Sequence, residues 1–237
     1  MNTILGELFT GLGYVIGGIV LWWAASSSKL ATQGMGWVAF NGLSLGIVGA
    51  KLTQLVAQGW PTKVPITAAL DPSAGGRALL GGLVFGWIGV EVAKWRLGIR
   101  RSTGDLFALA LPAGEAVGRI GCYFNGCCYG EKSDLPWAIY QHGAWRHPSQ
   151  IYSAITAFAL FIGLLAIRKH MQREGDLFLL YLCGFGATRF LLEFVRWRES
   201  TYFGLSPMQW FCLELMAGSV ICWWLRSRRT ASIARVN

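Results

Sequence analysis

Seven stretches of the chain are predominantly apolar, and each is long enough to cross a lipid bilayer as a helix. A helix needs about 20 mainly apolar residues to span the hydrocarbon core. The stretches lie at about residues 4–25, 35–57, 77–97, 104–124, 149–168, 175–196 and 206–225. This pattern predicts an all-α, polytopic membrane protein of about seven transmembrane helices, which form a single transmembrane domain over residues 1–237.

Two of the polar segments between these stretches are long enough to fold outside the membrane. They lie at about residues 58–76 and 125–148, and both are rich in glycine, proline and polar residues. No lysine or arginine precedes the first apolar stretch, and Glu7 lies at its start. Because a signal peptide needs a positively charged leading region, we expect the first stretch to be retained as a membrane span.

Basic residues are distributed unevenly between the two sides of the predicted helices. Only 14% of the residues are charged, against about 25% in soluble domains. With the N-terminus outside, twelve of the 21 lysines and arginines fall inside and five fall in outside loops. This asymmetry predicts an N-out, C-in orientation. We interpret the basic clusters as cytoplasmic helix ends and not as a nucleic-acid surface.

Two local motifs predict how individual helices begin or bend. Ser206, Pro207 and Gln209 occupy the positions of an N-cap, a first-turn proline and the third residue of a capping box, so a helix should begin there. Pro112 lies inside the fourth stretch and should kink or locally open that helix.

Arginines inside apolar stretches are the first candidates for chemistry, because an arginine at a helix centre costs about 2.5–3.5 kcal/mol on insertion scales. Arg119 lies at the outer end of the fourth stretch, in the glycine-rich run GRIGCYFNGCCYG at 118–130. Glycines let a backbone approach a ligand closely, and a guanidinium group can bind a phosphate with two hydrogen bonds. The alternative is that Arg119 extends to the interface as a structural residue.

A second group of charges lies in the sixth stretch. Arg189, Glu193 and Arg196 are spaced i, i+4 and i+7, which predicts that they share one helix face. Glu193 can neutralise one arginine and leave the other available for an anion such as a lipid phosphate. A purely structural ladder of ion pairs is the alternative.

A third motif, RHPSQIY at 146–152, lies where the fifth helix should begin. A helix N-terminus offers unpaired N–H groups and the positive end of a dipole. Ser149 and Gln150 are candidates for binding there, with helix capping as their alternative role. His147 is one of only three histidines in the chain.

The three cysteines at positions 122, 127 and 128 have several alternative roles. Packing in a tight turn, a disulfide from Cys122 to Cys127 or Cys128, and a transient nucleophile are all open. A metal site has little support from the sequence, because no Cys-x-x-Cys pair is present.

Taken in order, these motifs resemble the prolipoprotein diacylglyceryl transferase family of bacterial inner membranes. The resemblance covers most of the chain, including the LSPMQ run at 205–209. Within the signature G-R-x-G-N-F-x-N-x-E-x-x-G, the chain matches at Gly118, Arg119, Gly121, Asn125 and Gly130, and departs at Cys122, Tyr123 and Cys127.

The resemblance implies a multi-pass inner-membrane transferase that takes a diacylglyceryl group from phosphatidylglycerol. Its acceptor would be the cysteine thiol of a preprolipoprotein, and glycerol phosphate would be released. Arg119 and Arg189 would hold the phosphate and stabilise charge on the leaving group. Other residues would shape the site: Asn125, Gly130, Gly81, Gly82, Gln150, Glu193 and Arg196. No cofactor or metal is expected.

Departures from the family pattern concern proton handling. The family's His-Gly-Gly motif corresponds here to Leu80, Gly81 and Gly82, and leucine cannot take a proton. His147 and Glu193 are then the candidate bases. The alternative function is a non-catalytic protein that binds or transports anionic phospholipid.

Overall fold

The computed structural model describes residues 2–27, 34–57, 79–171, 173–197 and 201–233. The chain forms two compact units, one of Met1–Ala24 with Ser102–Asn237 and the other of Ala25–Arg101. Each unit is described by itself. The prediction of one transmembrane domain over the whole chain stays a prediction, and the loop at 58–76 lies outside the described residues.

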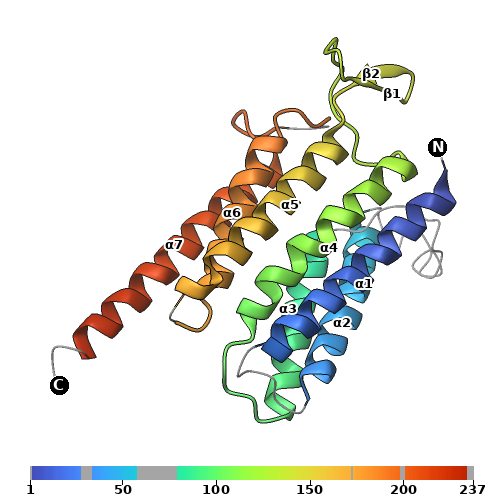
Figure 1. The fold of residues 1–237 in the computed structure, drawn as a ribbon. Helices are drawn as coiled ribbons and strands as arrows, with labels where there is room; N and C mark the ends of the chain where they lie inside the picture. The colour runs from blue at the N-terminus through green and yellow to red at the C-terminus, as the bar shows by residue number, and fades with distance from the viewer. Residues whose placement is uncertain (1, 28–33, 58–78, 172, 198–200, 234–237) are drawn as a thin grey trace. The chain divides into compact units, whose positions relative to one another are not determined.

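The described residues form seven α-helices, one short 3-10 helix and one two-stranded antiparallel sheet (Figure 1). The elements are α1 (Thr3–Ser27), α2 (Met35–Ala57), α3 (Leu79–Arg96), α4 (Gly104–Asn125), β1 (Ile139–Gln141), β2 (Ala144–Arg146), α5 (Ser149–Ile167), η2 (Arg168–His170), α6 (Asp176–Leu192) and α7 (Pro207–Ile233). The prediction of an all-α protein with seven long helices is confirmed. Two helix ends differ most from the prediction: α7 continues to Ile233, eight residues beyond the predicted end, and α6 ends at Leu192, four residues before it.

Surface composition is that of a membrane protein. Four segments meet the length and apolarity needed to cross a bilayer: Thr3–Ser27, Met35–Thr53, Ser149–His170 and Pro207–Arg228. Large apolar side chains lie on the outside of these helices, including Ile155 on α5 and Trp223 on α7, each more than half exposed. A soluble protein rarely exposes contiguous apolar surface on this scale, so these faces are expected to contact lipid.

Helices α4, α5, α6 and α7 lie side by side in the larger unit (Figure 1). Helix α4 packs against both α5 and α6, and α6 packs in addition against α7. Helices α4, α5 and α6 therefore pack together, and the charged residues of α4 and α6 lie within this group. Helix α4 runs through Pro112 as one continuous helix, so the helix is not interrupted there, and the predicted kink stays a prediction.

Glycines allow α1 to approach α4 closely. A Cβ atom added to Gly13 would lie 2.8 Å from the carbonyl oxygen of Gly114, and one added to Gly114 would lie 2.8 Å from the carbonyl oxygen of Gly13. Without a hydrophobic driving force between helices in lipid, small residues permit the close van der Waals packing that holds helices together.

The smaller unit consists mainly of α2 packed against α3. Its contact also depends on glycines, since a Cβ atom on Gly89 would lie 2.5 Å from the carbonyl oxygen of Asn41. Gly81 is equally constrained, because its Cβ atom would lie 2.5 Å from the carbonyl oxygen of Gly49. The glycines of this stretch therefore have a packing role in addition to any role in binding.

The N-terminus of α7 forms the predicted capping box. The backbone N–H of Gln209 donates to Oγ of Ser206 at 3.1 Å, and the backbone N–H of Ser206 donates to Oε1 of Gln209 at 2.9 Å. Two amide groups that lack partners within the helix are thereby satisfied. The predicted start of α7 is confirmed by this geometry.

Residues 125–148 fold into a compact cap over one end of the larger unit (Figure 1). Strands β1 and β2 pair as a hairpin in which Ile139 is opposite Arg146. The guanidinium group of Arg146 donates to the carbonyl oxygens of Gln141 and Gly130 at 3.1 Å each, which ties the hairpin to the glycine-rich run. This segment, which its length allowed to fold, thus contains a hairpin, and its place outside the membrane stays a prediction.

Gly13→Ala should destabilise the larger unit by about 1–3 kcal/mol, because the added methyl group would collide with the backbone of α4. Gly11 is the matched control on the same helix, since an added Cβ there meets nothing within 4 Å. Thermal unfolding of the purified protein in detergent measures both variants. Equal melting temperatures for Gly13→Ala and Gly11→Ala would contradict the proposed close packing of α1 on α4.

Candidate functional site

A small pocket, partly open to the exterior and with room for about one water molecule (about 10 Å³), lies among α4, α5 and α6. Ten residues line it: Glu115, Arg119, Ser153, Thr156, Ala157, Leu160, Phe185, Thr188, Arg189 and Leu192. Apolar side chains form much of the wall, and three charged groups and three hydroxyl groups face it. This combination of an apolar wall and a few polar groups is typical of a ligand site.

Arg119 is held by an acidic residue one turn earlier on α4. Its Nε and Nη2 atoms donate to Oε1 of Glu115 at 3.0 and 2.7 Å. Both side chains are largely buried, with 13% and 21% of their surface exposed. Because both hydrogen bonds use one carboxylate oxygen, Glu115 fixes the guanidinium plane without enclosing the rest of its donors.

Arg189 approaches the cavity from α6 and is 7% exposed. Its Nη2 atom lies 3.0 Å from Oε2 of Glu193. The two atoms form an ion pair, but their geometry does not meet the criteria for a hydrogen bond. Its Nε and Nη1 atoms are buried and have no hydrogen-bond partner. Leaving a buried charged donor unsatisfied costs more than about 1–3 kcal/mol. Two such donors on one guanidinium group therefore indicate a site for an anion.

Glu193 is fixed by the N-terminus of α7. Oγ of Ser206 donates to Oε1 of Glu193 at 3.2 Å while the same hydroxyl oxygen accepts the amide hydrogen of Gln209. The side-chain amide of Gln209 contacts the carbonyl oxygen of Phe190 at 3.4 Å. The capping box therefore joins α7 to the end of α6 and sets the position of the carboxylate beside Arg189.

The site carries an excess of positive charge. Arg189 interacts electrostatically with Arg119 and Arg196, as well as with Glu193 and Glu115. Three guanidinium groups against two carboxylates leave one positive charge without a counterpart among these five groups. A singly charged anion would neutralise them.

The sequence matches the family model for prolipoprotein diacylglyceryl transferase over residues 7–225. The chain belongs to this family. Among similar proteins, the phosphatidylglycerol–prolipoprotein diacylglyceryl transferase of Verminephrobacter eiseniae is 35% identical over 68% of this chain and 62% of its own length. That of Methylobacillus flagellatus is 37% identical over 59% of each chain. That of Methylibium petroleiphilum is 31% identical over 92% of this chain and 91% of its own length.

The matched part of the chain spans about three fifths of the length of the first two of these relatives. The third match extends over almost the whole length of both proteins. The relatives are bacterial, and the fold is that of a multi-pass membrane protein. The protein is therefore a bacterial polytopic membrane protein of the diacylglyceryl transferase family.

Arg119 and Arg189, which the sequence analysis singled out, face the same cavity. The position of Arg196 was wrongly predicted, because α6 ends at Leu192 and the chain then turns away. Residue 196 pairs instead with Gly130 in an antiparallel bridge. Two backbone hydrogen bonds support this bridge, from Glu131 to Val195 at 3.0 Å and from Trp197 to Tyr129 at 3.3 Å.

Gln150 supports the glycine-rich run, and Gly130 is the last residue of that run. The side-chain amide of Gln150 donates to the carbonyl oxygen of Cys127 at 2.8 Å and to Oε1 of Gln141 at 3.1 Å. A Cβ atom on Gly130 would lie 2.5 Å from the carbonyl oxygen of His147. Neither residue lines the cavity, so any effect of either on a ligand would pass through the backbone that it positions.

Two other members of the predicted site, Asn125 and His147, are not among the residues that line the cavity. Asn125 ends α4 and contacts α1 at Gly6, where an added Cβ atom would overlap the amide group of Asn125. The backbone N–H of His147 donates to the carbonyl oxygen of Glu131. The Nδ1 atom of His147 is buried and has no hydrogen-bond partner. Neither side chain lines the cavity between α4 and α6.

Gly81 and Gly82 belong to α3 in the smaller unit, where they pack against α2. Their predicted contribution to binding therefore stays a prediction. The side chain of Leu80, at the position of the family histidine, lies outside the described residues.

Glu115 is a charged cavity residue that the sequence analysis missed. It is an acidic residue inside an apolar stretch, four positions before Arg119, so the same spacing rule that was applied to Arg189 and Glu193 would have found it. The hydroxyl groups of Ser153, Thr156 and Thr188 were missed as well. They carry no signal in the sequence, because each donates to a backbone carbonyl of its own helix, as serine and threonine commonly do.

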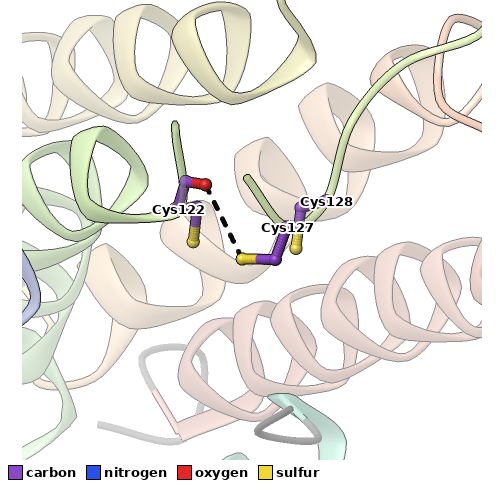
Figure 2. A group of neighbouring side chains, drawn as sticks. All are labelled: Cys122, Cys127 and Cys128. Carbon is purple, nitrogen blue, oxygen red and sulfur yellow. Dashed lines mark hydrogen bonds between the residues drawn. The ribbon is translucent and has the colours of Figure 1, made fainter. Parts of the chain in front are cut away.

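None of the cysteines at positions 122, 127 and 128 forms a disulfide in this structure. Their sulfur atoms lie within 4.8 Å of one another (Figure 2). Hydrogen bonds from the thiols of Cys122 and Cys127, together with the charges of Arg196 and Arg119, lower the pKa of the Cys128 thiol. The hydrogen bond with Cys122 has the opposite effect on Cys127 and raises the pKa of that thiol.

Ser206→Ala should lower the free energy of unfolding by about 0.5–2 kcal/mol, because it removes the N-cap of α7. The same substitution removes the hydroxyl group that holds Glu193. Ser219→Ala is the matched control, because Ser219 is a buried α7 serine that donates only to a carbonyl oxygen one turn earlier. Thermal unfolding in detergent compares the two. A control at least as destabilised as Ser206→Ala would contradict the importance of the cap.

Proposed function

We propose that this protein transfers a diacylglyceryl group from phosphatidylglycerol to a cysteine thiol of a preprolipoprotein. One observation carries the proposal: Arg119 and Arg189 face a single cavity, and two buried donors of Arg189 have no partner. A phosphate group provides the acceptor oxygens that such donors require. The names and chain coverage of the relatives support the same donor and acceptor.

The charge of the site suits a phosphodiester. Phosphatidylglycerol carries one negative charge on its phosphate, and the three charged side chains that line the cavity, Arg119, Arg189 and Glu115, have one positive charge in excess. The apolar side chains of the wall, which include Leu160, Phe185 and Leu192, suit a lipid ligand, and the pocket must widen to admit one. An uncharged lipid, which has no phosphate group, would leave the guanidinium groups without a counter-charge.

The proposed reaction forms one bond and breaks one bond. The acceptor sulfur attacks the glycerol carbon that carries the phosphate, a carbon–sulfur bond forms, and the carbon–oxygen bond to phosphate breaks. Glycerol phosphate leaves with the electron pair of that bond, so its negative charge increases in the transition state. Preorganised donors aimed at developing charge supply a large catalytic effect, and the unpaired Nε and Nη1 atoms of Arg189 are suited to this task.

The thiol proton needs an acceptor within about 3 Å, or within reach through one water molecule. Neither of the two candidates from the sequence lines the cavity, but Glu193 is the better placed, because it contacts Arg189, which does line it. Glu115 is a third candidate. It lines the cavity, and both of its hydrogen bonds with Arg119 use Oε1, so Oε2 is not needed for that pair.

One observation favours a second candidate function, which is non-catalytic binding or transport of anionic phospholipid. Leu80 stands where the family pattern has a histidine, while the two cavity arginines are present. This alternative predicts that phospholipid binds and that no glycerol phosphate is released.

Arg189→Lys and Arg119→Lys should each lower turnover by about 100-fold or more, because removing one preorganised donor typically costs 10²–10³-fold. Lysine keeps the charge and loses the planar fork. The assay uses purified protein, phosphatidylglycerol labelled in its headgroup and a peptide containing the acceptor cysteine, and it measures released glycerol phosphate. Arg168→Lys, at the opposite end of α5, is the matched control and should retain full activity.

If the wild-type protein releases glycerol phosphate and both cavity variants keep this activity, the arginines do not act as proposed. Binding of phosphatidylglycerol without any release of glycerol phosphate would instead establish the non-catalytic alternative. Growth of a bacterium depleted of its own diacylglyceryl transferase tests the acceptor separately. Failure to restore growth, with glycerol phosphate still released in vitro, would exclude the preprolipoprotein as acceptor and leave the lipid donor in place.

A further inference from the structure

The cysteine cluster at the end of α4 is not used by the proposed reaction. Cys122 lies in the last turn of the helix, and Cys127 and Cys128 follow the left-handed residue Gly126 that ends it. This turn brings the chain back, so that all three thiol groups meet beside the helix end (Figure 2). Their sulfur atoms lie within 4.8 Å of one another.

We propose that Cys122, Cys127 and Cys128 bind one soft, thiophilic metal ion through their three sulfur atoms. A metal–thiolate bond is about 2.3 Å long, which places the sulfur atoms of a trigonal site about 4.0 Å apart. Sulfur atoms at the corners of a triangle with 4.8 Å sides would therefore need to move inward by only about 0.5 Å each. Rotation of thiol side chains supplies such a movement without a change of backbone.

The backbone of the cluster is held in place from outside. Oγ of Ser149 donates to the carbonyl oxygen of Cys128 at 2.7 Å, and the side chain of Gln150 donates to that of Cys127 at 2.8 Å. The backbone N–H of Cys127 donates to the carbonyl oxygen of Cys122 at 3.1 Å. Cys128 itself has a φ of 60°, a left-handed conformation that is uncommon for a residue with a side chain. A strained and supported loop of this kind is typical of a functional site.

The type and number of ligands favour Cu(I) over Zn²⁺. Soft thiolates select Cu(I) and Zn²⁺ among the common metals, but structural Zn²⁺ is almost always four-coordinate. Among the described residues, the cluster consists of three cysteines with no histidine or carboxylate among them. Three sulfur atoms complete a trigonal Cu(I) site.

The surroundings can offset the charge of such a complex. Binding requires deprotonated thiols, and one Cu(I) ion with three thiolates carries two negative charges. Arg119 interacts electrostatically with Cys122 and Cys128, and Arg196 interacts with Cys128. Cys127 is exposed while the other two are half-buried, so an ion can enter from the side of Cys127.

Cu(I) titration of the purified full-length protein, with its thiols reduced and oxygen excluded, tests the proposal. A chromophoric Cu(I) chelator competes with the protein and reports both stoichiometry and affinity. The wild-type protein should hold one Cu(I) per chain, and Cys122→Ser, Cys127→Ser and Cys128→Ser should each weaken binding by at least about 100-fold. Cys222→Ser is the matched control, because this exposed cysteine of α7 lies outside the cluster. X-ray absorption should show three sulfur neighbours.

A parallel titration with Zn²⁺ distinguishes the two ions, and one equivalent of either ion that depends on all three cysteines supports the site. The proposal is wrong if neither ion binds, or if the single variants bind as well as the wild-type protein. A disulfide between Cys122 and either neighbour in the untreated protein, seen by mass spectrometry, would also overturn it. If a variant does not fold, the melting temperature of the wild-type protein tests the site instead. Cu(I) should raise this temperature, and prior alkylation of the thiols should abolish the increase.

No measurement in this test depends on turnover. Its failure would therefore leave the proposed lipid chemistry intact, and failure of the lipid assay would leave the metal site intact.

Discussion

Pairing of arginine charge in a largely apolar environment is the constraint on which the larger unit depends. An unpaired arginine at the centre of a membrane helix costs about 2.5–3.5 kcal/mol even on the mildest scales. Two arginines on neighbouring helices would in addition repel each other. Glu115 and Glu193 each lie four residues from an arginine in the sequence and form an ion pair with it. These two ion pairs reduce the electrostatic repulsion between α4 and α6.

The two ion pairs differ in a way that bears on function. Glu115 forms two aligned hydrogen bonds with Arg119, so that guanidinium group is held in one orientation. Glu193 meets Arg189 with one unaligned contact, and two donors of Arg189 remain without partners. Arg119 is consequently positioned by the protein alone, whereas Arg189 reaches full hydrogen bonding only with a further acceptor. The capping box of α7 maintains this difference, because Ser206 holds the second oxygen of Glu193.

Patterns that depend on neighbouring residues were predictable from the sequence. The seven apolar stretches, the start of α7 at Ser206 and the folded segment at 125–148 all follow from local rules of length, capping and composition. The end of α6 could not be predicted in the same way. Apolar and charged residues continue to Arg196 with helical spacing, yet the chain leaves the helix after Leu192.

A partner about 65 positions earlier in the sequence explains this ending. Backbone hydrogen bonds join Val195 to Glu131 and Trp197 to Tyr129, on either side of the bridge between Gly130 and Arg196. Buried backbone groups need partners whichever element supplies them, and the glycine-rich run supplies them here. A rule that considers only i, i+4 and i+7 cannot detect this competition. The glycine at 130 is required for it, since a Cβ atom there would collide with both His147 and Val195.

The same arrangement explains why the cysteine cluster and the arginine site are neighbours without being one site. Residues 119 and 122 lie on consecutive turns of α4, and the bridge at Gly130 brings Arg196 beside Cys128. Arg196 therefore interacts with Arg189 on one side and with a thiol on the other. Negative charge on the sulfur atoms attracts Arg196 and opposes its repulsion of Arg189. The protonation or metal content of the three thiols must then alter the potential at the cavity, even though no cysteine lines it.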